Sequence, residues 1–214
     1  LECGIPYKAL MQRSGYRLSL LDACLVTHEH ADHARAAHDL LAVGIPLYCS
    51  AGTADALHIT TTPGARPVLR HLCAVSIGTM TVLPVSVCHD AAEPLGWSIV
   101  STAYCTRLVF LPDTSRADYI FPPANHIMIE CNHMGAASMA DTNAYLAYRV
   151  LENHLSLQAC IDFLQHQDLS RIRDIRLIHI SRTHGDPDAM CRATRAATGK
   201  QIIIASEEKT HVLY

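Results

Sequence analysis

The sequence contains little of what marks a membrane, secreted or disordered protein. No apolar run among its 214 residues approaches the roughly 18 residues that cross a bilayer. Residues 1–15 lack the basic start and apolar centre of a signal peptide. Only 17% of the residues are charged and 50% are hydrophobic, which is a composition typical of compact globular chains and not of disordered ones. We therefore expect a chain that folds without a membrane partner.

Two further absences narrow the choice of partner and compartment. The formal net charge is −3, so no overall basic field holds the protein on nucleic acid or on an anionic membrane, and any phosphate binding must be local. The nine cysteines are spread singly and no two form a Cys-x-x-Cys pair. An odd number of isolated cysteines argues against a disulfide framework. The composition therefore favours a reducing, cytoplasmic location.

Apolar runs and turn residues predict a mixed α/β fold in one domain that spans residues 1–214. The run 23–26 has no polar alternation, as expected of a strand that is buried on both faces. Predicted strands lie at residues 23–26, 45–49, 72–77, 80–88, 96–103, 107–111, 175–180 and 201–205. Predicted helices lie at residues 7–13, 34–42, 141–153, 156–165 and 187–197.

Fourteen histidines are many for this length, and three of them lie together directly after the strand at 23–26. His28, His30 and His33 stand with Asp32 within six residues. Zinc binds imidazole nitrogen and aspartate oxygen, and alternate residues such as His28 and His30 can face the same way. Asp32 and His33 are then placed to serve a second ion. A solvated turn is the plain alternative, but a turn has no reason to collect three imidazoles.

Two metal ions need more ligands than this segment supplies, and later strand ends provide them. His89 follows the strand at 80–88, Asp113 follows the strand at 107–111, and His179 lies near the end of the strand at 175–180. Any one of these residues alone is more often an ordinary core or surface residue. Together with the segment at 28–33, they favour a metal centre.

This ordered series resembles the ligand series of the metallo-β-lactamase superfamily, whose fold is a four-layer αββα sandwich. Within that superfamily the chain is similar to the WalJ/YycJ branch, whose characterised members act on DNA phosphodiesters. The resemblance covers essentially the whole chain. It is carried by the segments at residues 26–33, 89–90, 93–96, 111–114, 130–133, 153–156 and 178–181.

The resemblance implies two divalent metal ions and a hydrolytic reaction. The implied ligands are His28, His30 and His89 for the first ion, Asp32, His33 and His179 for the second, and Asp113 as a bridge between them. Zinc is the expected metal because imidazole suits it, although the carboxylates also admit manganese. The two ions would activate a shared water molecule for attack on a phosphodiester, so Asp32 counts as catalytic as well as metal-ligating.

A leaving alkoxide needs a proton, and two histidines in family-like segments are candidates to supply it. An imidazole with a pKa near 6.5 suits this role, which predicts His154 or His133 as the catalytic acid. Orientation of loops, or support of a metal ligand, is the alternative for both. Glu130 is a weaker candidate, as a residue that holds His133 or a metal-bound histidine through its second nitrogen. We expect the histidines at 38, 58, 71, 126, 166 and 211 to be ordinary.

The chain departs from the pattern that it resembles at three places. Related chains begin with two further strands, whereas this one opens at Leu1, so we expect the first strands of the sandwich to be lacking. A shortened sheet exposes an edge, which favours a homodimer. Glu2 stands where an aspartate is usual, and His184 replaces an acidic or amide residue.

Several activities fit these residues. The preferred one is a phosphodiesterase with a nucleic-acid substrate, that is, a nuclease, and a cyclic-nucleotide phosphodiesterase is the nearest alternative. Hydrolysis of a thioester or a lactam on the same fold is the next. A non-catalytic protein that keeps its metals only for folding is the last, and the seven-ligand set disfavours it because a structural zinc site closes at four ligands.

Overall fold

The computed structural model describes residues 1–205, so His211 lies outside the described residues. The chain divides into two compact units. The first comprises Leu1–Ser86 and Asp90–Leu95, and the second comprises Val87–His89 and the chain from Gly96 onward. Within residues 1–205, no helix has the length and apolar character that a bilayer crossing requires. The single domain expected over residues 1–214 stays a prediction.

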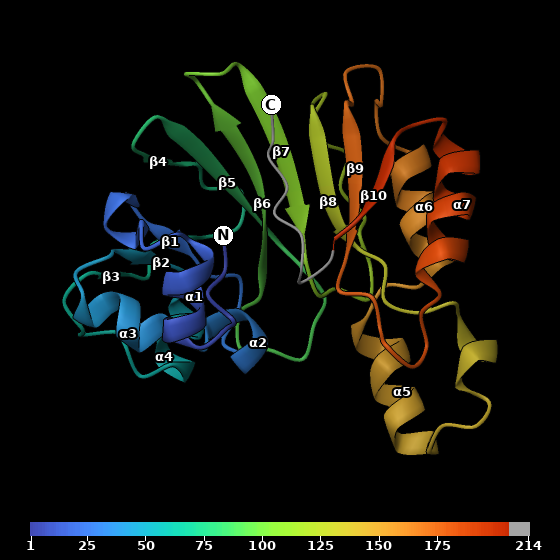
Figure 1. Cartoon of the computed structure of the whole chain (residues 1–214), viewed down its shortest axis with the longest axis horizontal. Coiled ribbons are helices and arrows are strands. Elements are labelled where there is room, and N and C mark those ends of the chain that lie inside the picture. The colour runs from blue at the N-terminus through green and yellow to red at the C-terminus, as the bar shows by residue number, and fades with distance from the viewer. Residues whose placement is uncertain (206–214) are drawn as a thin grey trace. The chain divides into compact units, whose positions relative to one another are not determined.

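The first unit is built around three short parallel strands. These are β1 (Cys24–Leu25), β2 (Leu47–Tyr48) and β3 (Ala65–Arg66), in that spatial order. Its helices are α1 (Tyr7–Arg13), η1 (Leu18–Leu20), α2 (Ala31–Ala34), α3 (Ala37–Ala42) and α4 (Ala51–Ala56). An antiparallel hairpin follows, with strands β4 (Val75–Ile77) and β5 (Met80–Ser86) (Figure 1).

One predicted helix of the first unit is wrong in its extent. The sequence predicted a single helix at 34–42, but the structure has α2 and α3 with a break at Ala36. The break has a local cause, because the Ala36 N–H donates to the carbonyl of Cys3 over 2.9 Å instead of continuing the helix. Cys3 is fully buried in the apolar core of this unit. The opening residues of the chain therefore decide where α2 ends.

The second unit is a sheet in which four neighbouring strands run parallel. Its spatial order is β10 (Ile202–Ile204), β9 (Asp174–Ile178), β8 (His126–Glu130), β7 (Thr106–Leu111) and β6 (Leu95–Ser101). Strands β7, β8, β9 and β10 are parallel, and β6 is antiparallel to β7. Helices α6 (Leu157–Gln165) and α7 (Pro187–Thr198) lie beside β9 and β10 (Figure 1). The ends of β7, β8 and β9 thus meet at one edge.

Strand β8 was not predicted, although it lies in the middle of this sheet. Its sequence has three apolar residues between His126 and Glu130, which is too short a run to stand out as a buried strand. Both polar ends are buried and satisfied. His126 Nδ1 lies 2.8 Å from Asp174 Oδ2, and the other oxygen, Asp174 Oδ1, accepts from Arg176 Nε over 2.8 Å. These pairings explain how a strand with polar ends fits a central position.

Between β8 and α6 the chain makes an excursion and returns. The excursion contains η2 (Ala136–Met139) and α5 (Ala144–Asn153), and α5 has no buried residue. Its two ends are held together, because the Asn132 N–H donates to the Leu155 carbonyl and the Leu157 N–H donates to the His133 carbonyl, each over 2.8 Å. The excursion therefore leaves the second unit and rejoins it at adjacent backbone positions.

Candidate metal centre

Five side chains of the second unit gather at the edge where its parallel strands end. Asp113 comes two residues after β7, Glu130 is the last residue of β8, and His179 directly follows β9. His154 follows α5 and His89 belongs to the short segment Val87–His89. Parallel neighbours place their carboxyl ends side by side, so the sheet itself brings the first three together. We call His89, Asp113, Glu130, His154 and His179 the second-unit cluster.

Asp113 lies at the centre of the second-unit cluster. Its side chain is only 3% exposed, with Oδ1 3.3 Å from His179 Nδ1 and Oδ2 3.7 Å from His89 Nε2. The two carboxylate oxygens thus approach different histidines. Asp113 therefore stands between two proposed ligand histidines, where a carboxylate can bridge two ions.

Glu130 is fully buried and accepts four hydrogen bonds. Its Oε1 lies 2.6 Å from His154 Nδ1 and 2.9 Å from His179 Nδ1. Its Oε2 accepts from the backbone N–H groups of Thr114 over 2.8 Å and Leu155 over 3.0 Å. Every donor is therefore a candidate site histidine or a neighbour of a candidate site residue.

A backbone contact fixes the orientation of the His89 ring. His89 Nδ1 lies 3.0 Å from the carbonyl oxygen of Asn153, which can only accept. The proton must then be on Nδ1, which leaves Nε2 as the nitrogen that can bind a metal. This is also the nitrogen that approaches Asp113.

His179 has an unusual backbone conformation for a residue with a side chain. Its φ is +55°, in the left-handed region that few residues other than glycine adopt. Asn132 stabilises it by donating from Nδ2 to the His179 carbonyl over 2.8 Å. Strained backbone of this kind persists where a functional side chain must be aimed. Asn132 is a supporting residue that the sequence did not predict.

The first unit holds the other proposed ligands in a similar arrangement. We call Glu2, His28, His30, Asp32 and His33 the first-unit cluster. The rings of His28 and His30 are 4.7 Å apart, those of His28 and His33 are 4.1 Å apart, and His33 Nε2 is 3.6 Å from Asp32 Oδ2. Glu2 contacts two parts of this segment. Its Oε2 lies 3.1 Å from His33 Nδ1, and its Oε1 accepts from the Thr27 N–H over 3.2 Å.

The backbone of residues 2–4 also supports α2 and its ligands. The Cys3 N–H donates to the His33 carbonyl over 2.8 Å. A Cβ added at Gly4 would lie 1.5 Å from the carbonyl oxygen of Asp32, so no other residue fits this close approach. The requirement for glycine follows from the position of the ligand loop.

The two candidate proton donors differ in their surroundings. His133 is 2% exposed, and both its nitrogens contact backbone: Nε2 is 3.2 Å from the His154 carbonyl, and Nδ1 accepts from the Gly135 N–H over 3.1 Å. Burial is the main cause that lowers the pKa of His133. His154 contacts Glu130 through Nδ1, and its side chain is 20% exposed. The geometry favours His154 as the donor and His133 as a brace between segments.

Two further polar residues follow His179 in the sequence. His184 Nδ1 contacts the Ser138 carbonyl over 3.1 Å, which ties the segment before α7 to η2. Arg182 is exposed three residues after His179. Neither belongs to the second-unit cluster.

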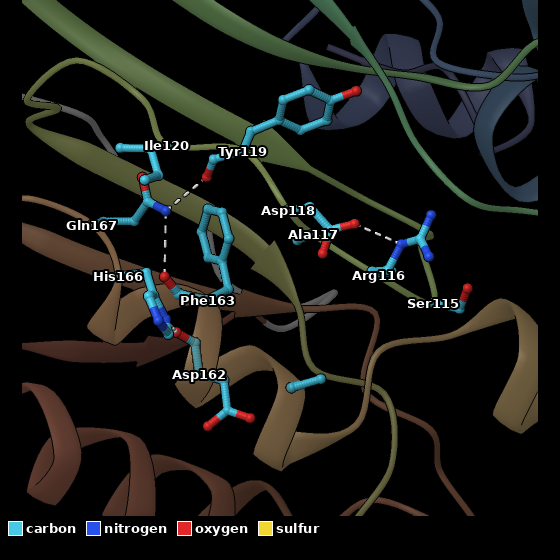
Figure 2. Close-up of a pocket in the computed structure, with 11 residues that line it drawn as sticks. Ser115, Arg116, Ala117, Asp118, Tyr119, Ile120, Asp162, Phe163, His166 and Gln167 are labelled. Atoms are coloured by element: carbon cyan, nitrogen blue, oxygen red, sulfur yellow. Dashed lines mark hydrogen bonds and ion pairs between the residues drawn. The ribbon is translucent and has the colours of Figure 1, made fainter.

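A separate pocket of about 400 Å³ opens in the second unit between the segment at 115–120 and α6 (Figure 2). Gln167 closes one end of it, since its side-chain amide donates to the Tyr119 carbonyl over 2.8 Å and accepts from the Phe121 N–H over 3.0 Å. At the other end Arg116 pairs with Asp118 over 2.6 Å. None of the seven proposed ligands lines this pocket, so it is distinct from the second-unit cluster.

The donor atoms of both clusters fit a divalent ion. In the first unit the ligand atoms of His28 and His30 lie within 4.8 Å of each other, as do those of Asp32 and His33. In the second unit those of Asp113 and His179 do the same. Imidazole nitrogen with carboxylate oxygen is the set that zinc and related ions prefer.

Comparison with known proteins agrees with this donor set. The family described as the beta-lactamase superfamily domain matches residues 6–204. The chain belongs to this superfamily. Members of this fold family bind divalent metals, and the fold is that of metallo-hydrolases. A search of curated proteins found no match.

Solved structures confirm the predicted metallo-β-lactamase fold at low sequence identity. The metallo-beta-lactamase fold protein YhfI from Bacillus subtilis has a TM-score of 0.67 and 18% identity, over 95% of this chain and 82% of that one. Zn²⁺-bound PqqB from Methylobacterium extorquens has a TM-score of 0.64 and 17% identity, with coverages of 89% and 73%. A diphosphatase from the PhnP family has a TM-score of 0.62 and 17% identity, with coverages of 93% and 72%.

Proposed function

We propose that this chain is a metal-dependent phosphodiesterase that holds two divalent ions, zinc in preference to manganese. Its substrate is a nucleic acid or a cyclic nucleotide, as the resemblance to the WalJ/YycJ branch implies. The observation that carries the proposal is the second-unit cluster, in which one buried aspartate approaches a different histidine with each oxygen. A diphosphatase among the similar structures supports a phosphate-containing substrate, and a zinc-bound one supports the metal.

The ligands that we propose are those that the resemblance implies. They are His28, His30 and His89 for one ion, Asp32, His33 and His179 for the other, and Asp113 for both. When bound, two such ions supply an activated water and electrostatic stabilisation of the phosphoryl oxygens. No side chain is then needed as the nucleophile.

The remaining residues prepare the ligands and the leaving group. Asn153 fixes the His89 ring through its carbonyl, and Glu2 holds His33. Because Nδ1 of His154 contacts Glu130, Nε2 is the nitrogen left to hand a proton to the leaving oxygen. His133 holds the segment that carries His154, through the His154 carbonyl.

The test is metal analysis of the purified protein followed by a substrate panel. Protein loaded with zinc or manganese is assayed on bis-p-nitrophenyl phosphate, single- and double-stranded DNA, RNA, cyclic nucleotides, a chromogenic cephalosporin and a thioester. We expect about two ions per chain and turnover of the phosphodiesters only. His89→Ala, which removes a ligand from the second-unit cluster, is the inactive control.

Three outcomes would contradict the proposal. Fewer than one tightly bound ion after loading would remove its basis. Turnover of the cephalosporin or the thioester alone would assign the other hydrolase function. Two bound ions without turnover of any substrate would assign a non-catalytic, metal-stabilised protein.

A further inference from the structure

Glu130 has more contacts to the candidate site than any one ligand requires. As a carboxylate it can only accept, so the two imidazole nitrogens at Oε1 must both be donors. His154 and His179 then each carry a proton on Nδ1. A single buried side chain thus sets the tautomer of two histidines at once.

The distances place protons, and not a metal ion, between Glu130 and these rings. Two ligands of one tetrahedral zinc, each bonded at about 2.0–2.1 Å, stand roughly 3.3 Å apart. The contacts of Glu130 Oε1 with His154 and His179 are 2.6 and 2.9 Å, which are hydrogen-bond lengths. Glu130 is therefore hydrogen-bonded to the rings themselves. Asp113 Oδ1, 3.3 Å from the same Nδ1 of His179, is a second acceptor beside that proton, so the proposed metal contact of this ring is through Nε2.

The other oxygen of Glu130 holds backbone instead of side chains. Oε2 accepts from the N–H of Thr114, the residue after Asp113, and from the N–H of Leu155, the residue after His154. The same carboxylate thus holds the loop after β7 and the segment that enters α6. Its position at the end of β8 lets it reach both, because β8 lies between β7 and β9.

We propose that Glu130 is the positioning residue of the second-unit cluster: it fixes the Nδ1-protonated tautomers of His179 and His154, so that Nε2 of His179 binds metal and Nε2 of His154 faces the leaving group. Its link to metal and leaving group rests on the proposed function. The tautomers follow from the contacts of Glu130, whose Oε1 lies 2.9 Å from His179 Nδ1, closer than Asn132 Nδ2 at 3.4 Å. Ligand histidines held by a carboxylate at the second nitrogen typically lose about 10–100-fold in metal affinity when that carboxylate is removed.

The tautomers are measured directly in the wild-type chain. Long-range ¹H–¹⁵N spectra of histidine-labelled protein, metal-free and zinc-loaded, distinguish a proton on Nδ1 from one on Nε2. We expect Nδ1 protonation of His154 and His179 in both samples, and a zinc-dependent shift of Nε2 in His179 only. Single His→Gln variants assign the resonances.

The variant is Glu130→Gln, and the matched control is Glu152→Gln on the exposed face of α5. In Glu130→Gln the amide keeps one acceptor oxygen, so either the two rings at Oε1 or the two backbone N–H groups at Oε2 face an NH₂ group instead of an acceptor. We expect zinc affinity, measured by competition with a chelator, to fall about 10–100-fold while Glu152→Gln leaves it unchanged. Glu130→Asp keeps the carboxylate and should recover part of the affinity.

The outcomes separate this inference from the proposed function. Nε2-protonated His154 and His179 in wild-type protein would overturn the inference even if the enzyme hydrolyses phosphodiesters. Complete loss of one bound ion in both Glu130 variants would make Glu130 a direct ligand and would also overturn it. Wild-type protein that shows the expected tautomers but binds no zinc would refute the proposed function and leave the fixed tautomers standing. If Glu130→Gln does not fold, the wild-type spectra still decide.

Discussion

Each unit organises its candidate ligands around one glutamate, but the two glutamates differ in depth and in the number of groups that they hold. Glu2 of the first unit has a side chain that is 16% exposed, and it accepts from one ring and one backbone N–H. Glu130 of the second unit is fully buried and accepts from two rings and two backbone N–H groups. Both glutamates accept from histidine rings and backbone N–H groups, and the buried Glu130 accepts twice as many of these hydrogen bonds as Glu2.

This difference indicates which of the two clusters is already ordered before a metal ion binds. A buried acceptor with several donors is costly to leave unsatisfied, so the second-unit cluster is tied to the stability of its sheet. Glu2 lies partly in solvent near the start of the chain, where water can replace a lost contact. We expect the first-unit cluster to tolerate changes that the second-unit cluster does not.

The largest effect is expected for Asp113→Ala, which removes the carboxylate at the centre of the second-unit cluster. Loss of the bridge should reduce turnover of bis-p-nitrophenyl phosphate by at least about 10³-fold, because it disturbs both metal positions. Arg182→Ala is the comparison, since an exposed arginine only positions substrate. Steady-state turnover at saturating metal measures both, and equal, small losses would show that Asp113 is not a bridge.

His154→Ala should have the next largest effect, and it should depend on the leaving group. We expect a loss of about 10²–10⁴-fold on substrates with a poorly stabilised alkoxide and almost none on p-nitrophenyl esters, which leave without a proton. Both metal ions should be retained, as elemental analysis would report. A variant that is equally impaired on both substrate types, or that loses an ion, would give His154 a positioning or ligand role.

Glu2→Gln tests the first unit in the same way as Glu130→Gln tests the second. Gln keeps one acceptor oxygen, so one of the contacts to His33 Nδ1 and the Thr27 N–H is retained. We expect a loss of metal affinity toward the lower end of the roughly 10–100-fold range, and a smaller fall in thermal midpoint than for Glu130→Gln. Chelator competition and thermal unfolding give the two values. An effect as large as that of Glu130→Gln would remove the contrast between the two glutamates.

The smallest effect on catalysis is expected for His133→Ala, which removes a brace. Its cost should be stability, about 1–3 kcal/mol, with the same relative activity on both leaving-group types. Because burial lowers the pKa of His133, protonation favours the unfolded chain, and the stabilisation from this residue is lost as the pH falls below about 6.5. The difference in unfolding free energy between wild type and variant should therefore shrink from pH 7 to pH 5 in metal-free protein. A difference that is constant over this range would contradict that sign.

The fold family and the ligand series could be predicted because both leave local signals. His28 to His33 stand within six residues of one another after an apolar run. Asp113 comes just after one strand that the sequence indicates, and His179 lies near the end of another. The superfamily and its fold were confirmed by comparison. The roles of the individual residues and the nuclease-type branch stay predictions.

The supporting residues could be predicted only in part, because their roles depend on contacts that are distant in sequence. Glu130 reaches His179 across 49 positions, and Glu2 reaches His33 across 31. Asn132 stabilises the left-handed backbone of His179, a conformation that a histidine in the sequence does not predict. The signal available for Glu130 was its place beside His133 in a family-like segment, which indicated a contact with a histidine but not which one. Strand β8 was missed for the reason that its ends are polar.

The clamped ends of the excursion between β8 and α6 make it an exchangeable module. The backbone hydrogen bonds of Asn132 and Leu157 join the two ends of this segment. Helix α5 has no buried residue. Longer, shorter or unrelated segments grafted from 141 to 152, after the buried Met139 of η2, should therefore leave the sheet intact, provided that the Asn153 carbonyl stays in place to hold His89. In evolution and in the laboratory, this is where new substrate preferences can be added while the proposed metal ligands remain unchanged.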